Sequence, residues 1–145
     1  MQDTIERQIT IQAPKQVVYQ AITDPAQITS WFPDTIEGSL AVGEQPVLGF
    51  GDHGKTQILV VAAQPYDYFA YRWVPGANHF LGDVTTVKTT IVEFKLTEQD
   101  GITTVAMTES GFSLLSAELA TASFEQNSGG WGYMLGRLEE KFTKE

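Results

Sequence analysis

The chain has 145 residues, enough for one domain with one core, and its 42% hydrophobic and 19% charged residues are typical of folded globular proteins. Its formal net charge of −9 disfavours nucleic acid and acidic membrane surfaces as partners. The lack of cysteine excludes disulfides and thiolate sites, and no apolar run suits a signal sequence or a membrane span. We therefore expect a single cytoplasmic domain over residues 1–145.

The first segments alternate and then change to a helical pattern. Residues 4–11 (TIERQITI) place three isoleucines on one face, with Arg7 among them, which predicts a half-buried strand. Pro14 is well placed to open a helix. Asp24 is a plausible cap for a second short helix, which we expect to end near Trp31.

The middle of the chain predicts five or six antiparallel strands. Runs rich in β-branched and aromatic residues are separated by breaks containing Gly, Pro and Asp. The runs cover residues 45–50, 55–64, 67–74, 85–98 and 102–112. The break EQDG at residues 98–101 is a hairpin signal.

A helix over residues 129–142 is expected to close the chain. An apolar stripe runs along it at helical spacing, comprising Trp131, Met134, Leu135, Leu138 and Phe142. The preceding residues 113–128 are small and polar and suggest only a helical turn and a loop. A sheet needs a cover for its apolar face, so the pattern predicts an α+β fold whose sheet packs on this helix.

The helix carries glycines that weaken it. Gly129, Gly132 and Gly136 fall on one flank, although each glycine in a helix interior costs about 1 kcal/mol relative to alanine. One hypothesis is that the missing side chains leave a cavity between helix and sheet. The alternatives are close packing against residues 113–120, or a frayed helix start.

Four ordered motifs carry a resemblance to a known family. They are ITIQAPKQVVYQAITDPAQITSWF (residues 9–32), the pattern ending in YRW at Trp73, TxVxMTxSGF ending at Phe112, and GWxxMLxxLExxF over residues 130–142. Together they resemble the SRPBCC (START-like, Bet v 1-like) superfamily, and more narrowly the homologues of the activator of heat-shock-protein-90 ATPase. The resemblance implies a helix-grip fold. In this fold a curved antiparallel sheet of six or seven strands wraps around a long C-terminal helix, with two short helices after the first strand and a cavity in between.

Strand alternation selects candidate ligand-binding residues. Phe69, Tyr71 and Trp73 should share an inner face, as should Phe94 with its alternate neighbours and Met107 with Glu109. The same positions could equally be plain core. The full candidate set is Trp31, Tyr71, Trp73, Phe94, Met107, Glu109, Phe112, Trp131 and Leu135.

The polar candidates leave alternatives open. Glu109 could be a hydrogen-bond acceptor or base at the cavity mouth, or a solvated residue beyond the core. His53 and His79 could pair at the cavity rim, or be ordinary surface-loop histidines. Arg7 could pair with Glu109 inside, or hold an exposed head at the sheet edge. No phosphate loop, dinucleotide fingerprint or nucleophile elbow is present.

We expect a protein that binds a small hydrophobic or aromatic molecule in the cavity, given the fold implied by the resemblance and the aromatic inner faces. The resemblance also implies an alternative, a stress-related interaction domain like the chaperone-ATPase activators. A third is a cyclase- or hydrolase-type enzyme that uses Glu109, His53 or His79, although the lack of a catalytic cluster favours binding over catalysis. No cofactor or metal is expected, and a homodimer and a chaperone partner are left open.

Overall fold

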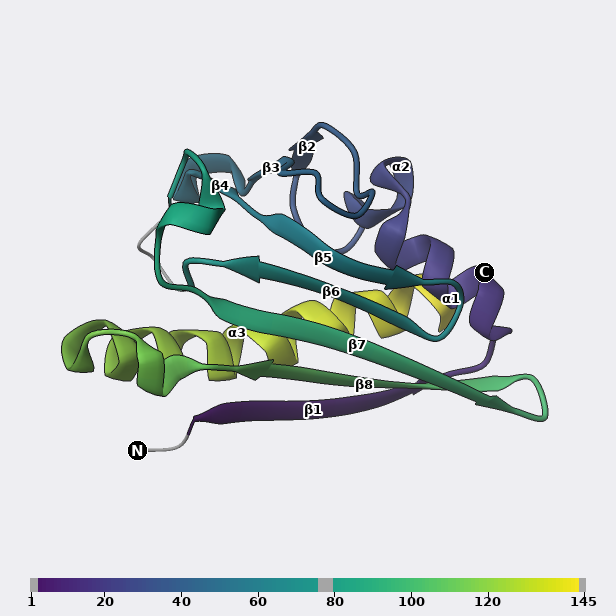
Figure 1. The fold of residues 1–145 in the computed structure, drawn as a ribbon. Coiled ribbons are helices and arrows are strands. Elements are labelled where there is room, and N and C mark those ends of the chain that lie inside the picture. The colour runs from purple at the N-terminus through teal and green to yellow at the C-terminus, as the bar shows by residue number, and fades with distance from the viewer. Residues whose placement is uncertain (1–2, 76–79, 144–145) are drawn as a thin grey trace.

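The computed structural model describes residues 3–75 and 80–143, and its largest element is an antiparallel sheet (Figure 1). Five strands form it in the order β1-β8-β7-β6-β5. The strands are β1 (Thr4–Ile11), β5 (Leu59–Gln64), β6 (Tyr68–Trp73), β7 (Thr90–Gln99) and β8 (Ile102–Ser110). The N-terminal strand thus pairs with the last strand, as the register of Ile5 opposite Glu109 shows.

A second, three-stranded sheet lies beside β5. It contains β2 (Thr35–Glu37), β3 (Val47–Gly49) and β4 (Lys55–Gln57) in the order β2-β3-β4. The run predicted as one strand over residues 55–64 is divided at Ile58, whose N–H donates to the carbonyl of Pro46. The described chain therefore has a five-stranded and a three-stranded sheet instead of one sheet of six or seven strands, while the α+β class is as expected.

The two short helices begin where the sequence predicts them, and the second ends at Ile28, before the expected end near Trp31. They are α1 (Lys15–Thr23) and α2 (Pro25–Ile28). The carboxylate of Asp24 accepts a hydrogen bond from the N–H of Ala26 at 3.0 Å, which confirms the predicted cap. Three single 3₁₀ turns, η1 (Gly51–His53), η2 (Val84–Thr86) and η3 (Phe112–Leu114), complete the connections.

The predicted hairpin is confirmed at the tip of β7 and β8. Asp100 and Gly101 both have positive φ, 55° and 77°, as the two central residues of a tight hairpin turn require. The long register from Ile91 opposite Ser110 to Gln99 opposite Ile102 follows from this turn.

The last helix is longer than expected. Helix α3 (Ala117–Thr143) has 27 residues, so most of the segment expected as a turn and a loop forms its first turns. Ala120 and Ser123 are buried there, and Leu119 and Phe124 pack against the core. The buried stripe through Trp131 therefore continues into the first turns of α3. The sequence did not show this, because small side chains carry little hydrophobic signal.

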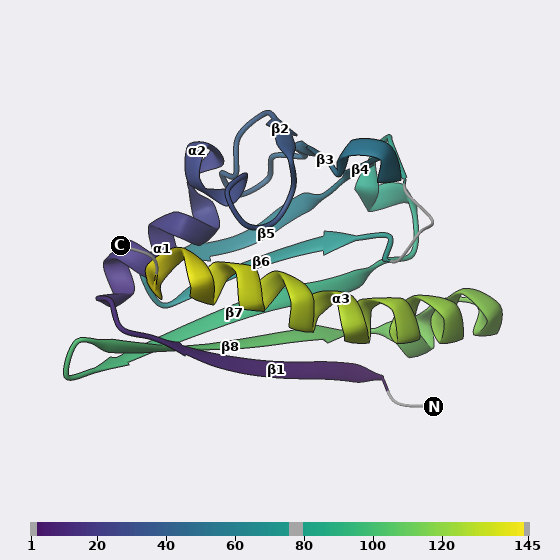
Figure 2. The same ribbon diagram turned by 180° about the vertical axis from the view of Figure 1, so that it is seen from behind.

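Helix α3 runs along the strands on one face of the five-stranded sheet (Figure 2). Trp131, Leu135 and Leu138 are at most 2% exposed, so the stripe predicted for the helix is confirmed. The facing strands contribute alternate residues, as predicted. The buried inner positions are Phe69, Tyr71, Trp73, Val92, Phe94, Leu96, Val105, Met107 and Glu109. The core therefore lies between this sheet face and α3.

The glycines of α3 do not line the core. Gly129, Gly130 and Gly132 are exposed, and a Cβ on any of them, or on Gly136, would meet no atom within 4 Å. The cavity hypothesis for these residues is therefore wrong, and so is close packing against residues 113–120. They also lie in the helix interior, far from its first residue Ala117, so they do not mark a frayed start.

We expect the double substitution Gly129→Ala and Gly132→Ala to stabilise the fold by about 1–2 kcal/mol, because alanine removes backbone entropy from the unfolded chain and meets open space here. Urea denaturation measures the change. Gly101→Ala is the matched control, since its Cβ also meets nothing within 4 Å but its φ is +77°. That substitution should destabilise by about 1 kcal/mol. A destabilised double variant would show that α3 packs against something on this flank.

No helix of the described chain covers the other face of the sheet, which Figure 1 shows. On this face the hydroxyl of Tyr68 donates to the carboxylate of Glu93. The pKa of Tyr68 is raised to about 12. Burial is the largest cause, followed by the hydrogen bond to Glu93 and the negative charge of Glu93.

This pKa predicts a loss of stability in alkali. The folded pKa of Tyr68 lies above the ordinary value of 10.0, so its contribution is complete below pH 10 and is lost as the pH rises toward 12. We expect the urea midpoint of the wild type to fall over that interval, and that of Tyr68→Phe to fall less. Equal falls in both proteins would show that Tyr68 is not a source of the alkaline loss.

Candidate functional site

A buried carboxylate lies at the centre of the core. Glu109 on β8 is 0% exposed, and its neighbours across the sheet are Ile5 on β1 and Val92 on β7. Its Oε1 accepts hydrogen bonds from Asn127 Nδ2 at 2.9 Å and from Trp131 Nε1 at 2.8 Å. Its Oε2 accepts from Trp73 Nε1 at 2.8 Å and from Thr90 Oγ1 at 2.5 Å. Strands β6 and β7 and helix α3 therefore meet at one side chain.

These four bonds occupy the acceptor sites of the Glu109 carboxylate. An indole N–H is only a donor, so Trp73 and Trp131 each require an oxygen of this group. Two donors on each oxygen suit the ionised carboxylate, which is an acceptor only. Neither ion pair of the described residues includes Glu109, so neutral dipoles stabilise its charge. A solvated Glu109, one of the two sequence interpretations, is thus wrong.

Aromatic rings surround this network. Phe32, between α2 and β2, contacts four other rings, with centroids 5.3 Å from Trp31, 5.5 Å from Phe50, 5.9 Å from Trp73 and 5.3 Å from Trp131. Phe94 on β7 contacts Trp131 at 6.0 Å. We call Trp31, Phe32, Phe50, Trp73, Phe94 and Trp131 the ring cluster. Its members come from β6, β7, α3 and two loop segments.

Tyr71 lies next to the ring cluster and has an unsatisfied polar atom. Its ring packs edge-to-face on Trp73, with centroids 5.2 Å apart, and the residue is 1% exposed. Its hydroxyl is buried and has no hydrogen-bond partner among the described residues. Burial, and then the negative charge of Glu109, raise the pKa of Tyr71 well above its ordinary value. The hydroxyl is therefore a protonated, unused donor in the core.

All nine predicted ligand-binding residues point into the core, and each is at most 8% exposed. Trp31, Trp73, Phe94, Glu109 and Trp131 gather in the ring cluster and its network, with Tyr71 beside them. Leu135 follows Trp131 by one turn, and Met107 pairs with Phe94 across the strands. Phe112 is apart from the ring cluster, because its ring contact is with Phe124 at 5.1 Å. Whether these residues bind a ligand stays a prediction.

The other polar candidates do not join Glu109. The guanidinium of Arg7 donates to the carbonyl of Ser128 at 2.7 Å and to its hydroxyl at 2.8 Å, so Arg7 holds β1 to α3. None of the donors to Glu109 is a histidine. His53 lies in η1, and His79 is outside the described residues.

Sequence reasoning missed four residues of this site, which are Thr90, Asn127, Phe32 and Phe50. Thr90 lies directly opposite Trp73 in the register of β6 and β7, so it would follow from knowing that pairing. Asn127 precedes Trp131 by four residues on α3, a spacing that a longer predicted helix would have shown. Phe32 had no polar or periodic signal of its own.

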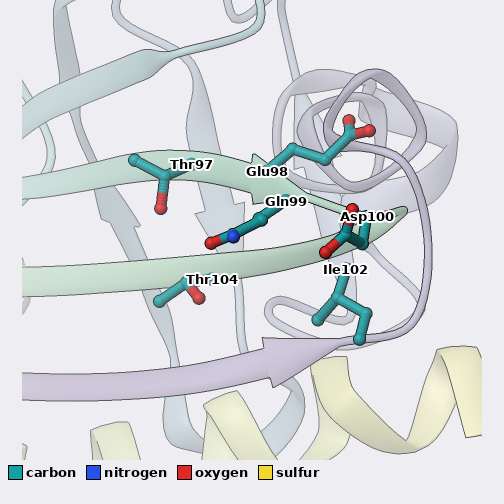
Figure 3. Close-up of a pocket in the computed structure, with 6 residues that line it drawn as sticks. All are labelled: Thr97, Glu98, Gln99, Asp100, Ile102 and Thr104. Carbon is teal, nitrogen blue, oxygen red and sulfur yellow. The ribbon is translucent and has the colours of Figure 1, made fainter.

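A shallow pocket lies at the far tip of the β7–β8 hairpin (Figure 3). Its lining residues are Thr97, Glu98, Gln99, Asp100, Ile102 and Thr104. All but Thr104 are exposed, and none belongs to the ring cluster. It therefore has no part in the Glu109 site.

Within the described residues, no helix is long and apolar enough to cross a membrane.

Solved structures with this fold are numerous. DynU16, described as a protein in the dynemicin biosynthetic locus, aligns with a TM-score of 0.76 and 26% identity over 97% of this chain. The match covers 47% of DynU16, so this chain spans about half of that protein's length. Protein MLL2253 from Mesorhizobium loti aligns with a TM-score of 0.75 and 24% identity over 94% of both chains.

A third neighbour carries a name that agrees with the sequence resemblance. It is the solution structure of the Aha1 dimer from Colwellia psychrerythraea, with a TM-score of 0.75 and 20% identity over 97% of this chain and 96% of that one. A search of curated protein sequences found no significant match. The family model for activator of Hsp90 ATPase homolog 1-like proteins matches residues 12–143, and the chain therefore belongs to that family.

Proposed function

We propose that this chain binds a small apolar or aromatic molecule between the five-stranded sheet and α3, at the ring cluster. The observation that carries the proposal is the complete hydrogen bonding of the buried Glu109 by Trp73, Trp131, Thr90 and Asn127. A buried carboxylate is costly, and an apolar residue of similar size often gives equal or greater stability. A network of this kind fixes ring orientations, which is what a preorganised binding site needs.

Phe32 is the ring that a ligand would replace. It contacts four other rings but belongs to neither the sheet nor α3, since it lies in the connection after α2. Trp73 and Trp131 each contact Phe32 and also contact each other, and both are held by hydrogen bonds to Glu109 that do not involve Phe32. A movement of this one connection would thus open an aromatic slot without breaking the network.

Native mass spectrometry of the purified protein, repeated after denaturation, tests for a copurified molecule. A second test is a ¹H–¹⁵N NMR titration with tetralin and 1-tetralone, because the three tryptophans give three indole N–H signals. We expect saturable shifts of the Trp73 and Trp131 signals. A protein that carries no copurified compound, and whose indole signals respond to neither probe, contradicts the proposal.

The proposal concerns binding, and a homodimer remains a separate prediction. The C. psychrerythraea neighbour is described as a dimer, but a likeness of 20% identity shows the fold alone and says nothing of the oligomeric state of this chain. The native mass spectrum reports the oligomeric state of this protein in the same experiment.

A further inference from the structure

The geometry points to a neutral aromatic ligand that carries a hydrogen-bond acceptor, such as an aryl ketone, with the hydroxyl of Tyr71 as the donor that selects it. This inference rests on the proposed function and names the chemical class for the same site. It starts from one unsatisfied atom, because the Tyr71 hydroxyl is buried and without a partner among the described residues. Buried polar groups are nearly always hydrogen-bonded, so a lone one calls for a partner from outside the chain.

The position of Tyr71 connects this atom to the slot. Its ring packs on Trp73 at 5.2 Å, and Trp73 in turn contacts Phe32 at 5.9 Å and Trp131 at 6.0 Å. In the sheet register Tyr71 is opposite Val92, which is opposite Glu109, so the hydroxyl and the carboxylate belong to the same inner face. A ligand ring in place of Phe32 would therefore lie one indole away from the phenol.

Charge decides between ligand classes. Glu109 is fully buried, so an anionic ligand near the ring cluster would meet an unscreened like charge. A cationic ligand would need a free acceptor, but each oxygen of Glu109 already accepts two hydrogen bonds. The raised pKa of Tyr71 keeps its hydroxyl protonated at neutral pH. Among the residues that the structure describes, the one buried side-chain polar atom without a partner is thus a donor, and a neutral acceptor satisfies it.

The test uses four probes with one bicyclic skeleton. Tetralin has no polar group, 1-tetralone adds a carbonyl, protonated 1-aminotetralin adds a cation and tetralin-1-carboxylate adds an anion. Binding is measured by calorimetry and by the indole N–H signals in the wild type and in Tyr71→Phe. Tyr133→Phe makes the same chemical change on an exposed residue of α3 and is the matched control.

We expect wild-type protein to bind 1-tetralone roughly fivefold to tenfold more tightly than tetralin, as one added hydrogen bond provides. The amine and the carboxylate should bind more weakly than the ketone. Tyr71→Phe should remove the preference for the ketone over tetralin, whereas Tyr133→Phe should behave as the wild type.

Three results overturn the inference, and they are distinguishable. If the probes bind but Tyr71→Phe keeps the ketone preference, the selection by Tyr71 is wrong while the proposed function stands. If no probe binds, and the purified protein carries no compound, the proposed function fails as well. Melting of the ligand-free proteins gives a second readout. A Tyr71→Phe variant with a clearly lower melting temperature would show that the hydroxyl already has a partner, such as a buried water, which overturns its role as an unused donor.

Discussion

Replacing Glu109 with alanine is expected to destabilise the protein by about 3–5 kcal/mol. The substitution leaves the indole N–H groups of Trp73 and Trp131 buried without an acceptor, and it also deprives Thr90 and Asn127 of theirs. Because small domains are stable by only about 5–15 kcal/mol, the loss is a large part of the total. Urea denaturation measures it. Glu6→Ala, an exposed glutamate on β1, should change stability by no more than about 0.5 kcal/mol.

The conservative variant Glu109→Gln gives a sharper result. A glutamine side chain keeps one oxygen and places an NH₂ group where the other oxygen was. Thr90 and Asn127 can each reverse a hydrogen bond to accept from this NH₂, but an indole cannot. We therefore expect one of the Trp73 and Trp131 indole signals to move strongly and the other to stay. If neither moved, the network at Glu109 would not exist in solution.

Phe32→Ala should destabilise the protein by about 3–5 kcal/mol, since it removes a fully packed aromatic ring and leaves a space between Trp31, Phe50, Trp73 and Trp131. The hydrogen bonds of Trp73 and Trp131 to Glu109 should hold these two rings in place and prevent the space from collapsing. We therefore expect benzene or toluene to bind the variant, and to restore about 2.7 kcal/mol when its concentration is a hundred times the dissociation constant.

The control for this variant is Leu114→Ala, which truncates a side chain that is 64% exposed and should change stability by no more than about 0.5 kcal/mol. Toluene should shift its unfolding midpoint no more than it shifts that of the wild type. A Phe32→Ala protein that is destabilised but not rescued by benzene or toluene would mean that the surroundings close over the missing ring. The connection after α2 could then not open a slot, and the proposed place of the ligand would be wrong.

Much of the fold followed from local pattern. Alternation placed Phe69, Tyr71 and Trp73 on one face because successive side chains of a strand point to opposite sides. Asp24 predicted a helix start because its carboxylate can cap the first backbone N–H groups. The Asp100–Gly101 pair predicted a hairpin because both residues tolerate positive φ. The first turns of α3 were missed because Ala and Ser carry little hydrophobic signal, although Ala120 and Ser123 are buried. A helix that packs through small residues shows its inner face only in three dimensions.

The site was predictable only in part, and for a related reason. Alternation showed that Glu109 faces inward, but not whether the core extends that far, so the sequence left both a buried and a solvated Glu109 open. The burial of Glu109 depends on Asn127 and Trp131. These two residues lie on α3, eighteen and twenty-two residues later in the chain, and donate hydrogen bonds to its carboxylate. Tyr71 presents the same limit. Whether its hydroxyl has a hydrogen-bond partner depends on all the residues that surround it in the fold, and no spacing in the sequence reveals them.

All three tryptophans of the chain, Trp31, Trp73 and Trp131, belong to the ring cluster, and none is more than 8% exposed. The tryptophan fluorescence of the protein, excited at wavelengths that tyrosine does not absorb, therefore originates entirely at the candidate site. Emission should have the short wavelength of indoles shielded from water, and closely packed Trp73 and Trp131 should couple electronically and give a strong near-ultraviolet circular dichroism band. A molecule that enters the ring cluster would alter both signals without any added label, so unmodified protein is sufficient for screening a compound collection.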